Sequence, residues 1–247
     1  MTDSSRTAVI TGASSGIGRA TAIALAEAGY EVVVGARREG LLSEVAAECG
    51  GHAHRLDVTE PDSIDAFVAA CPDRIDVLVN NAGGAFGQDS VEGGSDEDWT
   101  RMWQTNVLGA VRITRGLLPA LRRARGHIVM LGSIAGFETY LGGGGYTSAK
   151  HALRAVTRTL RLELLGQPVR ITEIAPGLVE TEFALVRFRG DRERADSVYA
   201  GMTPLVAEDI ARCVAFAVSQ PSHVNIDEIV VRPRDQATAA AIHRREA

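Results

Sequence analysis

The chain has 247 residues, of which 45% are hydrophobic and 23% charged, with a formal net charge of -5. A chain of this length can bury one large hydrophobic core, so we expect a single domain over residues 1–247. The acidic balance offers no extended basic surface for nucleic acid, and no apolar run, at the N-terminus or elsewhere, approaches the roughly 18 residues of a membrane span. Three cysteines without paired spacing predict neither a disulfide framework nor a metal site, which favours a cytoplasmic protein.

Strand-like and helix-like segments alternate along most of the chain. Parallel strands need long crossovers, so this alternation predicts a parallel sheet with helices on both faces. The fold class that we predict is α/β, a Rossmann-type doubly wound parallel sheet in three layers, α/β/α. The expected segments alternate between strand and helix, beginning with a strand: 7–11, 16–28, 31–36, 41–49, 54–57, 63–70, 76–80, 99–121, 127–133, 148–165 and 170–175.

Two irregular segments interrupt this order. Residues 83–98 are rich in glycine and polar residues, and residues 180–203 are charged and lie between a strand and a helix. Loops at the carboxyl ends of strands usually line the ligand crevice of such sheets, so we expect both to face the substrate, the second as a lid. The polar tail, residues 234–247, carries no motif and is interpreted as either a loose extension or an arm that contacts a partner.

A glycine-rich loop follows the apolar strand 8–10 at once and leads into a helix. Strand, glycines and helix in this order are specific for dinucleotide binding. Gly12 permits the tight turn, Gly16 lets the backbone approach the pyrophosphate, and Gly18 allows close helix packing. The loop residues expected to bind the cofactor are Gly12, Ser14, Ser15, Gly16, Ile17 and Gly18.

The end of the second strand indicates which dinucleotide is bound. An acidic residue here would hold the adenosine ribose of NAD, but this sequence has Ala36, followed by Arg37 and Arg38. Guanidinium groups pair with a 2′-phosphate, which favours NADP(H) over NAD(H). The alternative is that both arginines simply end a strand in solvent.

Tyr146 and Lys150 stand one helical turn apart and therefore face the same crevice. A nearby ammonium favours the ionised form of a tyrosine, so Lys150 is expected to tune Tyr146 as the general acid/base. Ser133 follows a buried strand and can orient the substrate oxygen by a hydrogen bond. His151 adjoins Lys150 but should point away from Tyr146, and the remaining histidines show no metal-ligand spacing. Trp99 and Trp103, one turn apart, are expected to pack as a helix face.

These motifs resemble, in order and over residues 7 to about 233, those of the short-chain dehydrogenase/reductase family. The segments that carry the resemblance are Thr11–Gly18, Asn80–Gly83, Asn106, Ser133, Tyr146–Lys150 and Pro176–Gly177. It implies that Asn106 holds a water in a proton relay to Lys150, that Lys150 also contacts the nicotinamide ribose, and that the protein is a homo-oligomer, a tetramer or a dimer. It also implies cofactor contacts at Asp57, Val58, Asn81, Ala82, Gly83, Tyr146, Pro176, Gly177, Val179 and Thr181.

Residues 173–191 and 223–229 resemble the NADP-dependent 3-hydroxy acid branch of that family, which includes serine and allo-threonine dehydrogenases. The resemblance implies a short 3-hydroxy acid substrate, with Arg187 in the lid as a candidate to receive its carboxylate. The glycine run before Tyr146, with Gly143 as a candidate substrate contact, departs from the branch and favours a broad carbonyl reductase of secondary metabolism as the alternative.

Other classes of protein remain open alongside the enzyme. The same fold can serve as a regulator that senses NADP(H) without catalysis, or chiefly as a scaffold subunit. A sensor has little need of the proton-transfer residues, and here all of them are present: Asn106, Ser133, Tyr146 and Lys150. The sequence therefore predicts an NADP-dependent enzyme that acts on a small alcohol or carbonyl compound.

Overall fold

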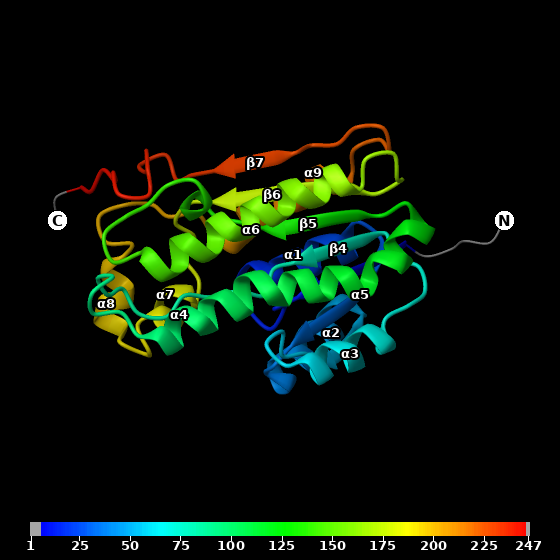
Figure 1. Cartoon of the computed structure of the whole chain (residues 1–247), viewed down its shortest axis with the longest axis horizontal. Coiled ribbons are helices and arrows are strands. Elements are labelled where there is room, and N and C mark those ends of the chain that lie inside the picture. Colours follow the sequence, from blue (N-terminus) through cyan, green and yellow to red (C-terminus); the bar gives the residue numbers. More distant parts are fainter. Residues whose placement is uncertain (1–5, 246–247) are drawn as a thin grey trace.

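A computed structural model describes residues 6–245, so residues 1–5 and 246–247 of the predicted domain and tail lie outside the described residues. Its centre is a seven-stranded sheet in the order β3-β2-β1-β4-β5-β6-β7, in which each neighbouring pair is parallel (Figure 1). The strands are β1 (Arg6–Thr11), β2 (Tyr30–Ala36), β3 (His52–Arg55), β4 (Val77–Asn80), β5 (His127–Leu131), β6 (Arg170–Pro176) and β7 (Glu228–Val231).

Helices cover both faces of this sheet. The bounds of those in the two layers are α1 (Gly16–Glu27), α2 (Glu39–Cys49), α3 (Pro61–Ala70), α5 (Gly109–Ala124), α6 (Gly144–Glu163) and α9 (Ala207–Val218). One core packs α1, α2 and α9 against side chains such as Ile10 and Val34, and the other packs α3, α5 and α6 against Val9 and Val33. Because both faces are buried there, the strands β1, β2, β4 and β5 are largely apolar, whereas the edge strand β3 is polar and partly exposed. The predicted Rossmann-type, three-layer fold is confirmed.

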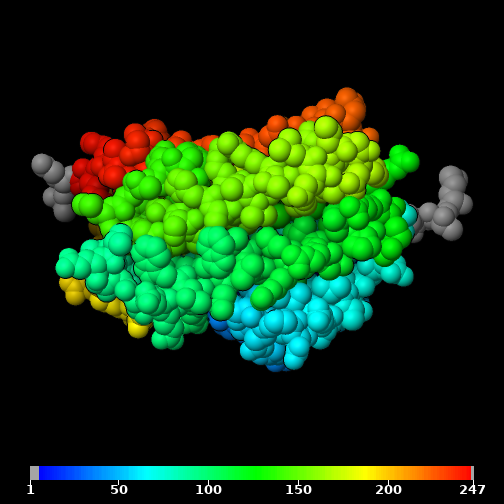
Figure 2. Space-filling view, in the orientation of Figure 1, coloured from blue at the N-terminus to red at the C-terminus, as the bar shows by residue number. Residues whose placement is uncertain are grey.

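The long helical segment expected over residues 99–121 begins earlier and is interrupted. It consists of α4 (Asp96–Trp103), a π turn (Gln104–Leu108) and α5, with the Ser95 hydroxyl accepting from the Asp98 amide at its start. Figure 2 shows α4, α5 and α6 as one continuous outer surface. None of the helices within residues 6–245 has the length and apolar character that a bilayer crossing requires.

Two other predicted boundaries were wrong. The third strand lies at His52–Arg55 instead of residues 54–57, and α6 starts at Gly144 instead of residue 148. Glycine is a poor helix former, but here close packing overrides that preference. A Cβ at Gly145 would lie 2.4 Å from Met102 Cε and 3.4 Å from Trp99, so the glycine lets α6 begin in close contact with α4.

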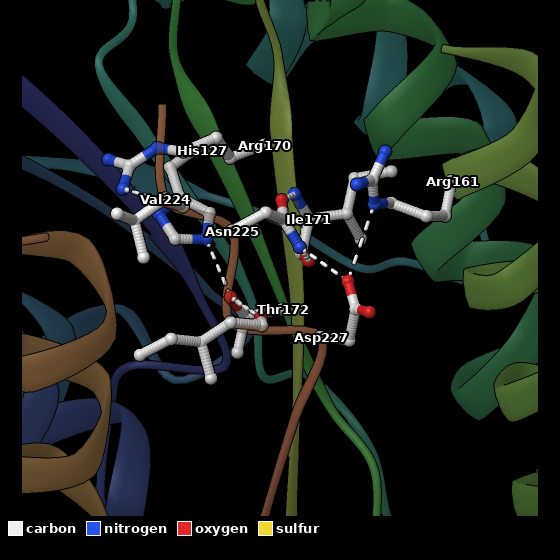
Figure 3. A network of polar contacts seen from close by, with 9 residues as sticks. His127, Arg161, Arg170, Ile171, Thr172, Val224, Asn225 and Asp227 are labelled. Atoms are coloured by element: carbon white, nitrogen blue, oxygen red, sulfur yellow. Dashed lines mark hydrogen bonds and ion pairs between the residues drawn. The ribbon is translucent and has the colours of Figure 1, made fainter. Parts of the chain in front are cut away.

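A polar network ties the amino ends of β5 and β6 to the segment that enters β7 (Figure 3). His127 Nε2 lies 2.7 Å from Thr172 Oγ1, which donates to the carbonyl of Ile226 at 2.6 Å. The Asn225 side chain exchanges hydrogen bonds with both backbone groups of Ile171, at 2.8 and 2.9 Å. Burial lowers the pKa of His127 to about 3, so the ring is neutral at physiological pH. This network stabilises the end of the sheet opposite the predicted active site.

The tail expected to be a loose extension or a partner-contacting arm folds back on the domain as far as it is described. Gln236 pairs with Ile242 in an antiparallel bridge, and the Arg245 amide donates to the carbonyl of Gly201 at 2.7 Å. The tail lies at the end of the molecule that also holds the two short helices of the lid, α7 (Phe183–Arg187) and α8 (Arg192–Ser197) (Figure 1). The loose-extension interpretation is therefore wrong for residues 234–245.

Candidate active site

The predicted site residues follow the carboxyl ends of successive strands, where an open α/β sheet forms its ligand crevice. Six strands contribute segments, namely 12–18 after β1, 37–38 after β2, 57–58 after β3, 81–83 after β4, 133 after β5 and 176–181 from the last residue of β6 onward. Tyr146 and Lys150 come from α6, which begins at the same edge. The fold therefore brings the segments predicted from separate motifs together at the carboxyl edge of the sheet.

The glycine loop has the strained geometry that its residues suggest. Gly12 and Gly16 have φ values of 68° and 53°, which disfavour side chains. A Cβ on Gly18 would lie 2.4 Å from Asn81 Nδ2, and this amide donates to the carbonyls of Thr11 and Gly12, each at 3.0 Å. The Asn81 side chain thus holds the glycine loop in place, and the N–H groups at the amino end of α1 are of the kind that can bind a phosphate.

Arg38 lies over this loop and forms an anion site with it. Its guanidinium is 2.6 Å from Ser15 Oγ and 3.1 Å from Ser14 Oγ, and it forms an ion pair with the Glu182 carboxylate at 2.8 Å. The hydrogen bond from Arg38 is the main reason why the pKa of Glu182 lies below its usual range. One guanidinium and two hydroxyls around an anionic oxygen are the donor set that a phosphate requires, so the residues present fit an NADP 2′-phosphate.

Arg37 points elsewhere. Its guanidinium lies 4.0 Å from the carboxylate of Asp57, and both border a groove against α4. Val58, next in the chain, packs so closely on Gly109 that a Cβ there would lie 2.8 Å from Val58 Cβ. The sequence could not distinguish the roles of the two arginines. In the structure Arg38 contacts the glycine loop, and Arg37 lies beside Asp57 instead.

Lys150 and Tyr146 occupy adjacent turns of α6, with Lys150 Nζ 5.8 Å from the centre of the Tyr146 ring. Lys150 is 6% exposed and donates to the Leu131 carbonyl at 2.8 Å. Burial lowers the pKa of Lys150 to about 8, against the opposing effect of Glu173. Burial also raises the pKa of Tyr146, so in this structure desolvation outweighs any charge that favours the phenolate, and Tyr146 carries its proton at neutral pH.

Ser133 begins the 3₁₀ turn Ile134–Gly136 directly after β5. Its hydroxyl accepts from the Ala135 amide at 3.1 Å and is 3.4 Å from the Pro176 carbonyl. The Ser133 hydroxyl also counteracts part of the rise in the pKa of Tyr146 that burial causes. The structure thus places Ser133 between the loop after β6 and the tyrosine.

Asn106 lies in the π turn between α4 and α5 and is 1% exposed. Its amide donates to the carbonyls of Gly84 and Met102, each at 2.8 Å, and accepts from the Gly84 amide at 3.2 Å. A Cβ on Gly83 would lie 2.7 Å from Asn106 Oδ1. Both amide hydrogens are engaged, so this side chain fixes the segment after β4 at the edge of the crevice.

A pocket lies beside Tyr146, between α4, the glycine run and the lid. Its lining residues are Phe86, Gly87, Asp89, Gly94, Ser95, Asp98, Trp99, Met102, Gly142, Gly145, Tyr146 and Arg187. Gly143, a predicted substrate contact, is not in this lining and packs on the ring of Tyr140, where a Cβ would lie 2.6 Å from Cε2. Its neighbours Gly142 and Gly145 line the pocket in its place.

Further predictions concern Trp99, Trp103 and His151. Trp99 lines the pocket, while Trp103 is 44% exposed, so they do not form one packed helix face. His151 is exposed and bonds through its ring to the Thr147 carbonyl at 2.8 Å, which agrees with the prediction that it points away from Tyr146.

Arg187 is held over the pocket by two hydrogen bonds of its guanidinium. Nε donates to the Gly87 carbonyl and Nη1 to the Tyr140 hydroxyl, each at 2.9 Å. The charge of Arg187 also lowers the pKa of Tyr146, against the larger effect of burial. Arg189, two residues on, instead pairs with Asp98 at 2.5 Å and is largely exposed.

Sequence reasoning missed three polar residues at this edge. Glu182 forms the ion pair with Arg38, Glu173 is 2% exposed beside Lys150 and pairs with Arg154 at 3.4 Å, and Gln236 is 4% exposed at the loop after β6. An acidic residue inside an otherwise apolar strand could have identified Glu173. Gln236 has no comparable signal, because its partners are distant in the sequence.

Comparison with known proteins identifies the family. Residues 6–190 match the short chain dehydrogenase family, and the chain belongs to it. An uncharacterized oxidoreductase of Mycobacterium tuberculosis is 58% identical over 95% of this chain and 94% of its own length. The NADP-dependent 3-hydroxy acid dehydrogenase of Schizosaccharomyces pombe is 42% identical over 98% of both chains.

Among solved structures, the closed form of a serine dehydrogenase complexed with NADP⁺ superposes with a TM-score of 0.91. That protein is 36% identical, and the alignment covers 97% of this chain and 99% of the other. The predicted family and the prediction of an oxidoreductase are therefore confirmed. The NADP⁺ in the similar structure agrees with the cofactor predicted from Arg37 and Arg38.

Proposed function

We propose that this protein is an NADP(H)-dependent oxidoreductase that transfers a hydride between the nicotinamide and a short 3-hydroxy acid, or the corresponding β-keto acid or aldehyde. The observation that carries the substrate class is the guanidinium of Arg187 in the same pocket as Tyr146. A carboxylate bound by Arg187 would place the hydroxyl-bearing carbon of a short acid near the tyrosine.

The residues that hold the cofactor in this proposal lie along the sheet edge. Arg38, Ser14 and Ser15 hold the 2′-phosphate, the glycine loop and the amino end of α1 hold the pyrophosphate, and the segments at Asp57 and Asn81 border the adenosine. The loop from Pro176 to Thr181 lies at the nicotinamide end, and a Cβ at Gly16 would lie 3.3 Å from the Thr181 side chain. When bound, the reduced cofactor supplies a hydride and the oxidised cofactor accepts one.

Proton transfer is assigned to Tyr146. Its buried hydroxyl keeps its proton at neutral pH and can donate it to the developing alkoxide during carbonyl reduction. Ser133 orients the substrate oxygen, and the ammonium of Lys150 stabilises the tyrosinate that remains. Asn106 keeps the segment after β4 in place beside them.

The activity of this site should fall on the alkaline side near pH 8. The pKa of Lys150 is lowered to about 8, so its ammonium loses a proton as the pH rises through that value and the tyrosinate loses its stabilising charge. We expect kcat/KM for carbonyl reduction to decline above pH 8. Arginine stays charged throughout this range, so the Lys150→Arg variant should move the decline to higher pH. A decline that stays near pH 8 in that variant would assign it to another group.

The substrate class is tested with a panel of compounds and the Arg187→Ala variant. NADP-linked absorbance is followed with serine, allo-threonine, 3-hydroxybutyrate and 3-hydroxyisobutyrate, and NADPH oxidation with uncharged ketones. Loss of a charge-assisted contact should lower kcat/KM for the acids by roughly 10- to 100-fold and leave the uncharged ketones less affected. Arg192→Ala is the control, because that arginine of the same lid is exposed and does not line the pocket.

The same panel of compounds distinguishes the hydroxy acid enzyme from the alternative, a broad carbonyl reductase of secondary metabolism. The pocket has an apolar wall at Phe86, Trp99 and Met102, and two glycines line it beside Tyr146, which favours a broad carbonyl reductase over a strict hydroxy acid enzyme. Turnover confined to ketones, or an equal effect of Arg187→Ala on acids and ketones, would support this alternative and reject the hydroxy acid.

The assembly of the protein is a proposal from the family resemblance, and its location is one from the lack of paired cysteine spacing. We propose a homo-oligomer, a tetramer or a dimer, in the cytoplasm, with a small molecule as substrate and neither nucleic acid nor membrane as partner. Sedimentation of the protein without cofactor tests the assembly, and a monomer would overturn it.

A further inference from the structure

The C-terminal tail lies against the loop that follows β6. After β7 the chain turns at Pro233, whose carbonyl accepts from the Gln236 amide at 3.0 Å. A short antiparallel pairing between Gln236 and Ile242 then brings the chain back, with the His243 amide donating to the Asp235 carbonyl at 2.8 Å. The result is an ordered turn at the carboxyl edge of the sheet, where the candidate active site also lies.

The side chain of Gln236 inserts into the loop after β6. It is 4% exposed, and its Oε1 accepts from the Leu178 amide at 2.8 Å. A Cβ on Gly177 would lie 2.3 Å from this oxygen, so the side-chain amide can approach only because residue 177 is glycine. The Gly177 amide donates in turn to the Val231 carbonyl at 2.7 Å.

Further hydrogen bonds fix the rest of this loop. The Leu178 carbonyl accepts from the Leu205 amide at 3.0 Å, and the Glu180 amide donates to the Leu205 carbonyl at 2.8 Å. The Val179 carbonyl accepts from the Tyr199 hydroxyl at 3.0 Å. In this parallel pairing the N–H of Val179 takes no part, because the bonds are made by the residues on either side of it.

The tail contacts the far end of the lid as well. Arg245 donates through its backbone to the Gly201 carbonyl at 2.7 Å, and the Arg244 side chain donates to the Val198 carbonyl at 3.1 Å. The Ala239 amide donates to Glu138, which follows the turn that begins at Ser133, at 2.5 Å. One segment therefore connects the start of the lid, its end and the turn after β5.

We propose that Gln236 is a positioning residue for the nicotinamide end of the cofactor. By accepting the Leu178 N–H it fixes the Gly177–Leu178 peptide, while the Leu205 amide holds the next peptide through the Leu178 carbonyl. Together these two contacts present the backbone N–H of Val179 to the carboxamide of the nicotinamide. This inference rests on the proposed function, which places the loop from Pro176 to Thr181 at that end of NADP(H). The C-terminal tail thereby becomes part of the cofactor site, although it has no motif of its own.

The experiment compares two ligands and two substitutions at this position in the full-length protein. Gln236→Met keeps the length of the side chain and removes the acceptor, while Gln236→Glu retains an oxygen that can accept from Leu178. Dissociation constants are measured by calorimetry for NADPH and for adenosine 2′,5′-bisphosphate, which carries both adenosine phosphates and no nicotinamide. Arg234→Ala, a change to a largely exposed residue of the same tail, is the control.

We expect Gln236→Met to weaken NADPH binding about fivefold, as for one lost hydrogen bond, and to leave the bisphosphate unchanged. Gln236→Glu should restore much of the NADPH affinity, and Arg234→Ala should match the wild type. Equal weakening of both ligands would mean a general structural role, and no weakening of either would mean no role; both results overturn the inference and leave the proposed function intact. A wild-type protein that binds no NADPH would overturn both.

Discussion

Replacing Tyr146 with phenylalanine will lower kcat for carbonyl reduction by about a thousandfold and leave NADPH affinity nearly unchanged. The substitution removes only the hydroxyl, the group that we assign to proton transfer. The aromatic ring stays, and with it the edge-to-face contact with Phe183 at a centroid distance of 5.4 Å. A loss of turnover without a loss of folding or cofactor binding is therefore expected, and it is measured by single-turnover absorbance of NADPH together with binding by calorimetry.

Tyr140→Phe is the matched control for this variant. Tyr140 is a second tyrosine close to the same pocket, and its hydroxyl accepts from Arg187 at 2.9 Å. Its loss should alter KM for an acid more than kcat, because it positions a binding group. If Tyr146→Phe turned over at the rate of the wild type, another acid would have to be found. If the wild type bound NADPH and turned over none of the panel, the sensor interpretation would replace the enzyme.

The sequence predicted the architecture well because each signal is local. Apolar β-branched runs such as Val32–Val34 form buried parallel strands, and the glycines at 12, 16 and 18 encode a turn whose geometry excludes side chains. The helical spacing of Tyr146 and Lys150 likewise fixes their common face, wherever the helix begins. Features that depend only on neighbours in the chain can thus be predicted from the sequence alone.

The features that were not predicted depend on contacts between distant segments. The start of α6 at Gly144 requires Trp99 and Met102 to pack against glycines, and the contact of Gln236 with Leu178 joins residues 58 positions apart. The protonation state of Tyr146 also depends on distant segments, because its pKa is set mainly by burial, and the spacing of residues in the sequence does not reveal burial. Proximity along the chain suggested that the charge of Lys150 would tune the pKa of Tyr146, whereas burial in the folded protein has the largest effect on that pKa.

Arg38 is the residue on which the preference for NADP(H) is expected to depend. Arg38→Ala should weaken NADPH binding by roughly 10- to 100-fold, as for the loss of charge-assisted hydrogen bonds, and leave NADH binding little changed. Only Arg38 of the two adjacent arginines contacts Ser14 and Ser15, while Arg37 lies by Asp57. Arg37→Ala should therefore have a smaller effect on NADPH, measured in the same titration.

Glu182 provides a second test of the assignment of the 2′-phosphate to Arg38, because its substitution should strengthen NADPH binding instead of weakening it. Its carboxylate occupies the anion site of Arg38 in the present structure, so a 2′-phosphate that binds there must displace it. Glu182→Gln removes the competing charge, and NADPH binding should become severalfold tighter, with NADH unaffected. The effect should vanish in the Arg38→Ala background, because the competition requires the guanidinium. Tighter binding that persists without Arg38, or a loss of NADH affinity equal to that of NADPH in Arg38→Ala, would place the 2′-phosphate elsewhere. If both variants behave as expected, the Arg38 guanidinium pairs with Glu182 of the lid when the cofactor is absent and with the 2′-phosphate when NADPH is bound.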